Sequence, residues 1–270
     1  MDVRNSKVAD TPYENPTLIQ SLNRRSLKAS SQALPLVLFH DGSGTIFNYF
    51  LLDQLGRDVF GFVDPKATAA EEWEGGIAEM ALHYQDCMEQ AIAPGAIILG
   101  GWSFGGVLAL EVASIIRNNR LSPFTIAGVI LIDTRCPIGA PNIDPEFEEK
   151  QGIQAVHVTP QARALAEGSM RRATRMLRKW RLPWHTGAPD DLLHCTMIRA
   201  AQQSGQASSQ GSVLGWECFT EYLDLHALQV PGDHYTIFSE PNCEILSAKV
   251  KEACELTEHQ GADQKDGDRS

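Results

Sequence analysis

The sequence predicts an α/β protein with a doubly wound, mostly parallel sheet and a helical lid insertion. Short apolar runs alternate with stretches of helical periodicity, which is the pattern of a parallel sheet with helices on both faces. The runs at 96–99 and 128–132 are apolar almost throughout, as expected of central strands. A long helical stretch at 143–190 interrupts this alternation and exceeds an ordinary connection, so we interpret it as a lid.

The remaining elements follow in order along the chain. We expect strands at the apolar runs 34–39, 58–62, 96–99, 128–132, 195–198 and 225–230. We expect helices at 77–91, 104–117 and 240–256, where apolar side chains recur at helical spacing. This domain spans 16–256, and polar, aperiodic sequence predicts flexible tails at 1–15 and 257–270.

Composition excludes several classes of protein. The 270 residues include 23 basic and 34 acidic ones, and the formal net charge of −11 argues against nucleic acid and anionic membranes as partners. No apolar run is long enough to span a membrane, and residues 1–12 lack the apolar core of a secretion signal. The six cysteines show neither CxxC pairs nor ligand-like spacing, so we expect reduced thiols in a cytoplasmic protein and no metal site.

The strongest local motif is Gly101-x-Ser103-x-Gly105, which lies between the apolar run 96–99 and a helical stretch. This is the context of a nucleophile elbow, where a serine sits on a strained turn and small neighbours let strand and helix approach. The alternative is a glycine-rich turn that binds phosphate. It is disfavoured because the segment has neither GxGxxG spacing nor a P-loop lysine.

A nucleophilic serine needs a base, and we assign that role to His234. It lies in the segment Pro231-Gly-Asp-His-Tyr235, directly after the last expected strand, where an imidazole can reach over the sheet edge. His226 falls inside that strand and His259 in the polar tail. A surface loop histidine remains the alternative interpretation.

The orienting acid is expected at the carboxyl end of a strand between the two. Asp133 directly follows the apolar run 128–132, and a carboxylate there is costly unless it has partners. The alternatives are a simple strand-end cap, or Asp190 or Asp191, which precede a strand rather than follow one.

An oxyanion hole requires two backbone N–H groups. Phe104, directly after the serine, can supply one. The second is expected from the loop after the strand 34–39, with Asp41 and Gly42 as candidates. Because this loop does not contain the HGGG sequence, a plain glycine turn is the alternative.

The sequence resembles the thioesterase domains that release products from polyketide and non-ribosomal peptide synthases, especially the fungal polyketide type of the α/β-hydrolase superfamily. Four segments carry the resemblance, in that family's order and at similar separations: 35–44, 101–106, 129–133 and 231–235. The resemblance covers 16–256 and implies that a phosphopantetheinyl thioester acylates Ser103, with His234 as base and Asp133 as its orienter. It also implies that the stretch 143–190 is that family's lid.

We therefore expect a stand-alone thioesterase that releases a polyketide-type acyl chain by hydrolysis or cyclisation. Because these 270 residues contain no carrier domain, its partner is expected to be a separate acyl carrier protein of a polyketide synthase, acting in trans. No metal or diffusible cofactor is expected besides the carrier's phosphopantetheine. The alternatives are a carboxylesterase or lactonase acting on a free ester, and a non-catalytic relative that binds a small ligand.

The lid contains a basic run, 171–181. On a helix, three arginines share one face, and we expect them to dock an acidic carrier protein: Arg171, Arg175 and Arg178. Apolar side chains near the opposite face are expected to roof the acyl pocket: Met170, Leu177, Trp180 and Trp184. The alternative is an amphipathic helix whose charged face is only solvated.

Overall fold

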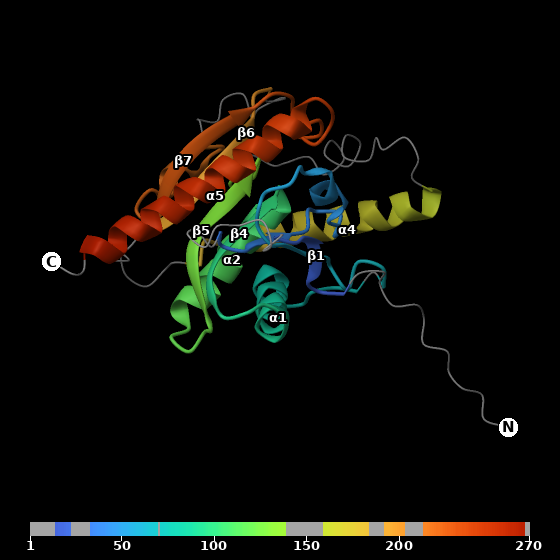
Figure 1. The fold of residues 1–270 in the computed structure, drawn as a ribbon. Coiled ribbons are helices and arrows are strands. Elements are labelled where there is room, and N and C mark those ends of the chain that lie inside the picture. Colours follow the sequence, from blue (N-terminus) through green and yellow to red (C-terminus); the bar gives the residue numbers. More distant parts are fainter. Residues whose placement is uncertain are drawn as a thin grey trace.

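The computed structural model describes residues 14–22, 33–69, 71–138, 159–183, 192–202 and 213–267. In these residues, seven strands form one sheet in the order β1-β3-β2-β4-β5-β6-β7 (Figure 1). The strands are β1 (Thr17–Gln20), β2 (Leu36–Phe39), β3 (Val59–Phe62), β4 (Gly95–Trp102), β5 (Phe124–Ile132), β6 (Leu193–Ala200) and β7 (Leu223–Val230). Only β1 is antiparallel to its neighbour, so the sheet is mostly parallel as expected.

Helices cover both faces of this sheet. The helices are α1 (Gly76–Ala91), α2 (Phe104–Asn118), α4 (Pro160–Lys179) and α5 (Asn242–Gly267), with short 3-10 turns η1 (Phe47–Leu51) and η3 (Trp216–Phe219). α1 and α2 pack on one face, and α5 packs on the other (Figure 1). The fold is therefore the α/β-hydrolase arrangement that the alternation of strands and helices predicted.

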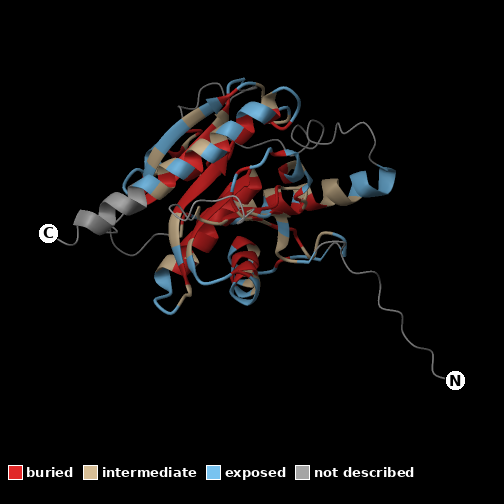
Figure 2. Ribbon diagram, in the orientation of Figure 1, coloured by how far each residue is buried: buried red, intermediate tan, exposed pale blue. Residues whose placement is uncertain are grey.

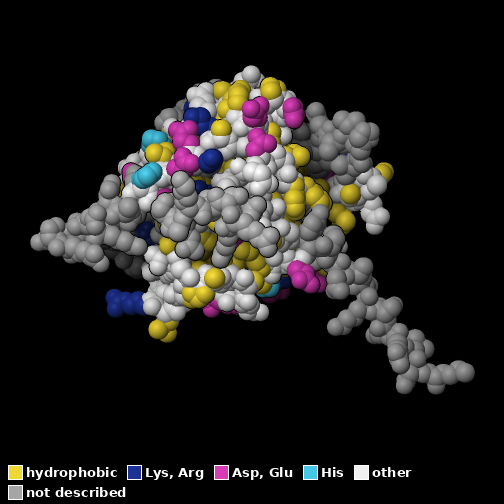
Figure 3. Space-filling model, viewed as in Figure 1, with side chains coloured by type: hydrophobic (Ala, Val, Ile, Leu, Met, Phe, Trp, Pro, Cys, Tyr) yellow, Lys and Arg dark blue, Asp and Glu magenta, His cyan; other side chains and the backbone are white. Residues whose placement is uncertain are grey.

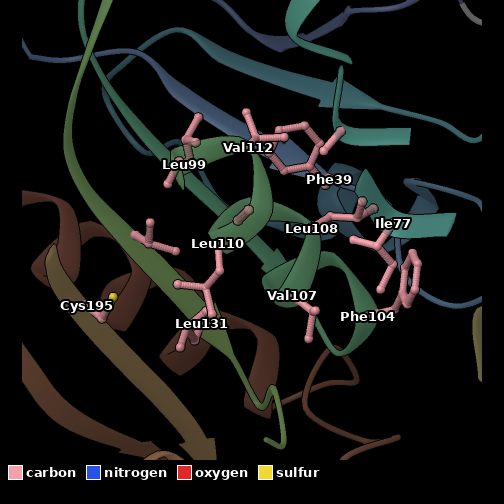
Figure 4. Packing of buried hydrophobic residues seen from close by; sticks show 14 of the residues in the cluster. Phe39, Ile77, Leu99, Phe104, Val107, Leu108, Leu110, Val112, Leu131 and Cys195 are labelled. Atoms are coloured by element: carbon pink, nitrogen blue, oxygen red, sulfur yellow. The ribbon is translucent and has the colours of Figure 1, made fainter. Parts of the chain in front are cut away.

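Side chains from successive strand residues enter two separate cores. Val37 and Phe39 of β2 pack with α1 and α2, whereas Leu36 and Leu38 pack with α5. This alternation follows from the two-residue period of a strand and requires apolar residues at every position. Figure 4 shows the first core, where Leu99 of β4, Leu131 of β5 and side chains of α2 meet. Figure 2 shows that burial is concentrated in the central strands and α2, whereas the edge strand β7 is largely exposed.

The chain ends differ from the expected tails. The predicted flexible tail at 257–270 is wrong for its first part, because α5 continues to Gly267. Thr257 is fully buried and donates to the Ala253 carbonyl, and Glu258 pairs with the buried Arg57 at 2.6 Å. At the other end, residues 1–13 lie outside the described part, but Asn15 exchanges two hydrogen bonds with the backbone of Val63. The short edge strand β1 was not predicted at all.

The described part of the predicted lid, 159–183, contains one helix, α4. Thr159 caps its start by accepting a bond from the Ala162 N–H at 3.2 Å, and Pro160 occupies the first turn. The rest of the predicted lid, 143–158 and 184–190, lies outside the described residues. No helix in the described ranges is both long enough and apolar enough to cross a bilayer.

Candidate active site

Ser103 occupies a strained turn between β4 and α2. Its φ of 56° and ψ of −116° lie in a region that non-glycine residues rarely adopt. The glycines around it are required by close packing. A Cβ on Gly101 would lie 2.3 Å from the Gly105 carbonyl carbon, and one on Gly105 would lie 2.3 Å from the Phe39 carbonyl oxygen. This is the geometry of a nucleophile elbow, and it explains why the motif consists of small residues around the serine.

Asp133 and His234 form a hydrogen-bonded pair at the same edge of the sheet. Asp133 follows β5, His234 follows β7, and Asp133 Oδ2 lies 2.7 Å from His234 Nδ1. Because a carboxylate only accepts, Nδ1 carries the proton and Nε2 is left for the serine. The Ser103 N–H donates to the carbonyl of Ile132, the residue before Asp133, at 3.0 Å, so the turn that carries Ser103 is also bonded to the end of β5.

The Asp133 carboxylate is held rigidly in the interior. It is fully buried, and Oδ1 accepts the Ala200 N–H at 2.8 Å. The Asp133 N–H donates to the Ile198 carbonyl, and its φ is 42°. β6 therefore fixes the orientation of the acid that orients His234. The rivals Asp190 and Asp191 lie outside the described residues, His226 is exposed on β7, and His259 is exposed on α5.

Hydrogen bonds within the loop after β2 set the direction of one of its N–H groups. The Asp41 carbonyl accepts two bonds, from His40 Nδ1 at 2.7 Å and from the Gly44 N–H at 3.0 Å. In a trans peptide the next N–H points the opposite way, so these bonds direct the Gly42 N–H outward. In the described part of the chain, no protein acceptor takes the N–H of Gly42 or of Phe104, which is the first residue of α2.

The same geometry favours Gly42 over Asp41 as the second oxyanion donor. The His40 carbonyl oxygen lies against Gly105, 2.7 Å from where a Cβ would be, which turns the Asp41 N–H away from the start of α2. The Asp41 side chain instead closes the loop, because Oδ1 accepts from both the N–H and the hydroxyl of Ser43. Burial raises the pKa of this carboxyl, while the bonds from Ser43 and the charges of His40 and His234 oppose the rise.

Sequence reasoning missed the contribution of His40. Its ring is 2% exposed, bonds the hydroxyl of Tyr84 at 2.8 Å and stacks on Phe104 with centroids 5.7 Å apart. It therefore holds the loop after β2 in place and also contacts Phe104, the residue after Ser103. Its position directly between an apolar strand and a glycine-rich loop is the only signal that could have identified it.

The lid helix contacts this loop and the nucleophile helix. Met170 and Ala173 lie closest to Gly42, each 3.8 Å from where a Cβ on that glycine would be, so α4 covers the loop after β2. Trp180 is buried, donates to Glu111 of α2 at 2.7 Å and packs edge-on against Trp216. Trp180 thus anchors the end of the lid helix to the core.

The remaining lid residues divide between interior and surface. Leu177 is partly buried against the same core, and Trp184 lies outside the described residues. Arg172, within the basic run, points inward and donates to Ser169 and to the Ala67 carbonyl. Arg171, Arg175 and Arg178 are exposed as expected, and Arg175 pairs with Glu72 at 2.5 Å.

Comparison with known proteins agrees with this geometry. The model of the thioesterase domain family matches residues 34–250. The chain is 42% identical to thioesterase AMT4 of Alternaria alternata, over 92% of this chain and 95% of that protein. It is 30% identical to the probable thioesterase gloN of Glarea lozoyensis, over 90% and 97% respectively.

A solved structure shows the same fold. The NocB thioesterase domain, in covalent complex with a fluorophosphonate nocardicin G analog, superposes with a TM-score of 0.69 at 22% identity. The superposition covers 87% of this chain and 98% of that one. Together with the family match over most of the chain, these similarities establish that this protein belongs to the thioesterase domain family and is a hydrolase.

Proposed function

We propose that the protein is a stand-alone thioesterase that releases a polyketide-type acyl chain from a separate acyl carrier protein. The observation that carries the proposal is the bond of 2.7 Å between a fully buried Asp133 and His234, at the sheet edge where the strained Ser103 lies. This arrangement places an oriented base and a nucleophile at the same edge of the sheet, and acyl transfer needs both.

The acylation step uses only groups of this site and the thioester. His234 Nε2 takes the proton of Ser103 Oγ as that oxygen attacks the thioester carbonyl carbon. The tetrahedral intermediate then collapses, the carbon–sulfur bond breaks, and the imidazolium returns the proton to the departing phosphopantetheine thiol. The acyl group is left on Ser103 as an ester.

Release of the acyl group repeats the sequence with a different nucleophile. His234 takes a proton from water, or from a hydroxyl of the acyl chain itself, and that oxygen attacks the ester carbonyl. The bond to Ser103 breaks and His234 returns the proton to Oγ. Water yields a free acid, whereas an internal hydroxyl yields a lactone, and both outcomes belong to the proposal.

The N–H groups of Phe104 and Gly42 complete the mechanism. The carbonyl oxygen becomes negatively charged in both tetrahedral intermediates, and fixed backbone donors stabilise that charge without reorganising. The loss of one such donor typically lowers kcat by about 10²–10³-fold. The hydrogen bonds of His40 and Gly44 to Asp41 hold one of the two donors in place.

We further propose that the carrier docks on the exposed arginine face of α4, which is defined by Arg171, Arg175 and Arg178. Acidic side chains spread over the α5 face of the molecule (Figure 3), in keeping with the net charge of −11. An arginine face on an otherwise acidic protein steers an acidic partner to one side. α4 lies over the oxyanion loop through Met170 and Ala173, so a carrier bound there would deliver its arm close to Ser103.

The function is tested with one acyl group presented on three substrates: a carrier-bound thioester, a small thioester and the matching oxygen ester. We expect the highest kcat/KM for the carrier-bound thioester and no turnover of any substrate by Ser103→Ala. Preference for the free oxygen ester would instead identify a carboxylesterase or lactonase. Failure of the wild-type protein to react with a fluorophosphonate would identify a non-catalytic relative.

A further inference from the structure

Trp102 lies directly before Ser103, and its ring packs against the imidazole of His234. It is the last residue of β4 and is 8% exposed. The centroids of the two rings are 5.1 Å apart and their planes are inclined by 33°. The two rings are thus closer to parallel than to edge-on, and the indole presents its face to the imidazole.

The indole is held in this position by its surroundings. The backbone N–H of Trp102 donates to the Tyr49 hydroxyl at 2.8 Å, and that hydroxyl donates to the Phe39 carbonyl at 2.6 Å. Phe238 packs edge-on against the indole, with centroids 5.3 Å apart. The ring therefore keeps its face on His234 unless several contacts are broken together.

Stability alone does not explain why this residue is a tryptophan. The indole Nε1 is buried, and it finds no hydrogen-bond partner among the described residues. A buried donor without an acceptor destabilises the folded state, and phenylalanine would fill an apolar site without that donor. What the indole offers instead is the aromatic face that attracts cations most strongly.

During catalysis His234 becomes a cation when it takes the proton of Ser103 or of the second nucleophile, and in the resting protein it becomes one when it is protonated at low pH. Asp133 approaches the ring at Nδ1, the Asp41 carboxyl of the loop after β2 interacts with it electrostatically, and the indole covers its face. We propose that Trp102 is a positioning residue that stabilises the imidazolium form of His234 through a cation–π interaction. This inference rests on the proposed role of His234 as the base.

The pH dependence distinguishes this role from simple packing. With Trp102→Leu, we expect the midpoint of the acid limb of kcat/KM to move down by about half to one pH unit. We also expect kcat to fall about tenfold, with a smaller change in KM. If the indole only shielded His234 from water, its removal would favour the cation and move the midpoint upward. Trp102→Phe should give a smaller downward shift.

The direct experiment is an NMR titration of the His234 ring protons in the resting protein. It needs no substrate, so it tests the contact even if the proposed thioesterase activity fails. The control is Phe238→Leu, which removes a ring that packs against the indole edge-on. That variant should lower Tm while leaving the midpoint unchanged.

We expect the His234 midpoint to move to lower pH in Trp102→Leu, and by a smaller amount in Trp102→Phe. An unchanged or raised midpoint in a folded Trp102 variant would overturn the proposal. If Trp102→Leu fails to fold, the direction of the shift in Trp102→Phe decides the question.

Discussion

Two Asp–His pairs lie at opposite ends of the strands, and a hydroxyl group accompanies each. At the carboxyl end, Asp133 and His234 lie near Ser103. At the amino end of β6 and β7, Asp224 Oδ2 lies 3.2 Å from His194 Nδ1, and the Thr196 hydroxyl lies 3.4 Å from His194 Nε2. The second constellation has the same kinds of chemical group: a carboxylate, an imidazole and a hydroxyl.

The difference lies in which member of each constellation is buried. Asp133 is fully buried and accepts a second bond, whereas the Asp224 side chain is 53% exposed. Thr196 is fully buried and out of reach of any substrate, whereas Ser103 is partly exposed on a strained turn. An acyl-transfer site therefore needs a buried acid and a reachable nucleophile, and residue types alone do not identify it.

The largest expected effect compares the two hydroxyl groups. Ser103→Ala should lower kcat by about a million-fold, because the nucleophile is lost. The Tm of this variant should stay unchanged or rise, because the strained turn no longer has to hold a catalytic hydroxyl. Thr196→Val is the matched change at the other end of the sheet and should leave kcat within about twofold, since packing changes there act on stability. Thioester turnover and thermal melts report both effects. Equal losses of kcat would contradict the assignment.

The second comparison concerns the acids. Asp133→Asn should lower kcat by about 10⁴-fold with little change in KM, because the amide no longer holds His234 in the required tautomer. Asp224→Asn makes the same change in the exposed pair, and we expect no measurable effect on kcat. If Asp190→Asn or Asp191→Asn had the larger effect, the acid would be wrongly assigned.

A smaller effect is expected on the lid. Reversing Arg171, Arg175 and Arg178 to Glu should lower kcat/KM for a carrier-bound substrate about tenfold or more and remove its salt dependence. The small thioester should be hydrolysed as before. Equal losses on both substrates would mean that the helix only shapes the pocket, and no loss on either would leave the arginines a solvated face.

The smallest effect concerns another buried carboxylate, Glu111 of α2. Burial raises the pKa of Glu111, and the bond from the Trp180 indole opposes the rise. Because the folded state then holds this proton more tightly than the unfolded chain, ionisation of Glu111 costs stability as the pH rises above its unfolded value. Glu111→Gln removes that cost and still accepts the Trp180 bond. Its Tm should exceed that of the wild type by about 2–4 °C at pH 7, and the gain should vanish near pH 4.

A Tm gain that persists at pH 4 would show that packing, and not the charge of Glu111, causes the difference. Trp180→Phe provides the complementary control, because it removes the donor while the carboxylate remains buried. We expect this variant to melt below the wild type at pH 7.

Much of this site could be predicted from the sequence, because the ends of apolar runs mark the ends of strands. The apolar runs ending at 99 and 132 place Ser103 and Asp133 at the carboxyl edge of the sheet, and the glycines around Ser103 follow from close backbone contacts. The supporting residues could not be predicted in this way. His40 and Trp102 look like ordinary strand-end residues until folding brings Tyr84 and His234 against them.

The same limit explains the error at the C-terminus and the unforeseen contacts of Trp180. Thr257 and Glu258 are polar, yet α5 continues through them, and the partner of Glu258 is Arg57, some two hundred residues away. The expectation that Trp180 roofs the acyl pocket stays a prediction, but its contacts with Glu111 and Trp216 were not foreseen. Each outcome depends on a partner distant in sequence, which local patterns do not reveal.

The central claim is that Ser103 carries the acyl group, and peptide mapping tests it most directly. The wild-type protein is quenched during turnover of a slow acyl thioester, digested and analysed by mass spectrometry. We predict one acyl adduct on the peptide that contains Ser103 and no adduct in Ser103→Ala. In Asp133→Asn the adduct should accumulate if the substitution slows release of the acyl group more than acylation. An adduct on a cysteine, or one that persists in Ser103→Ala, would contradict the account.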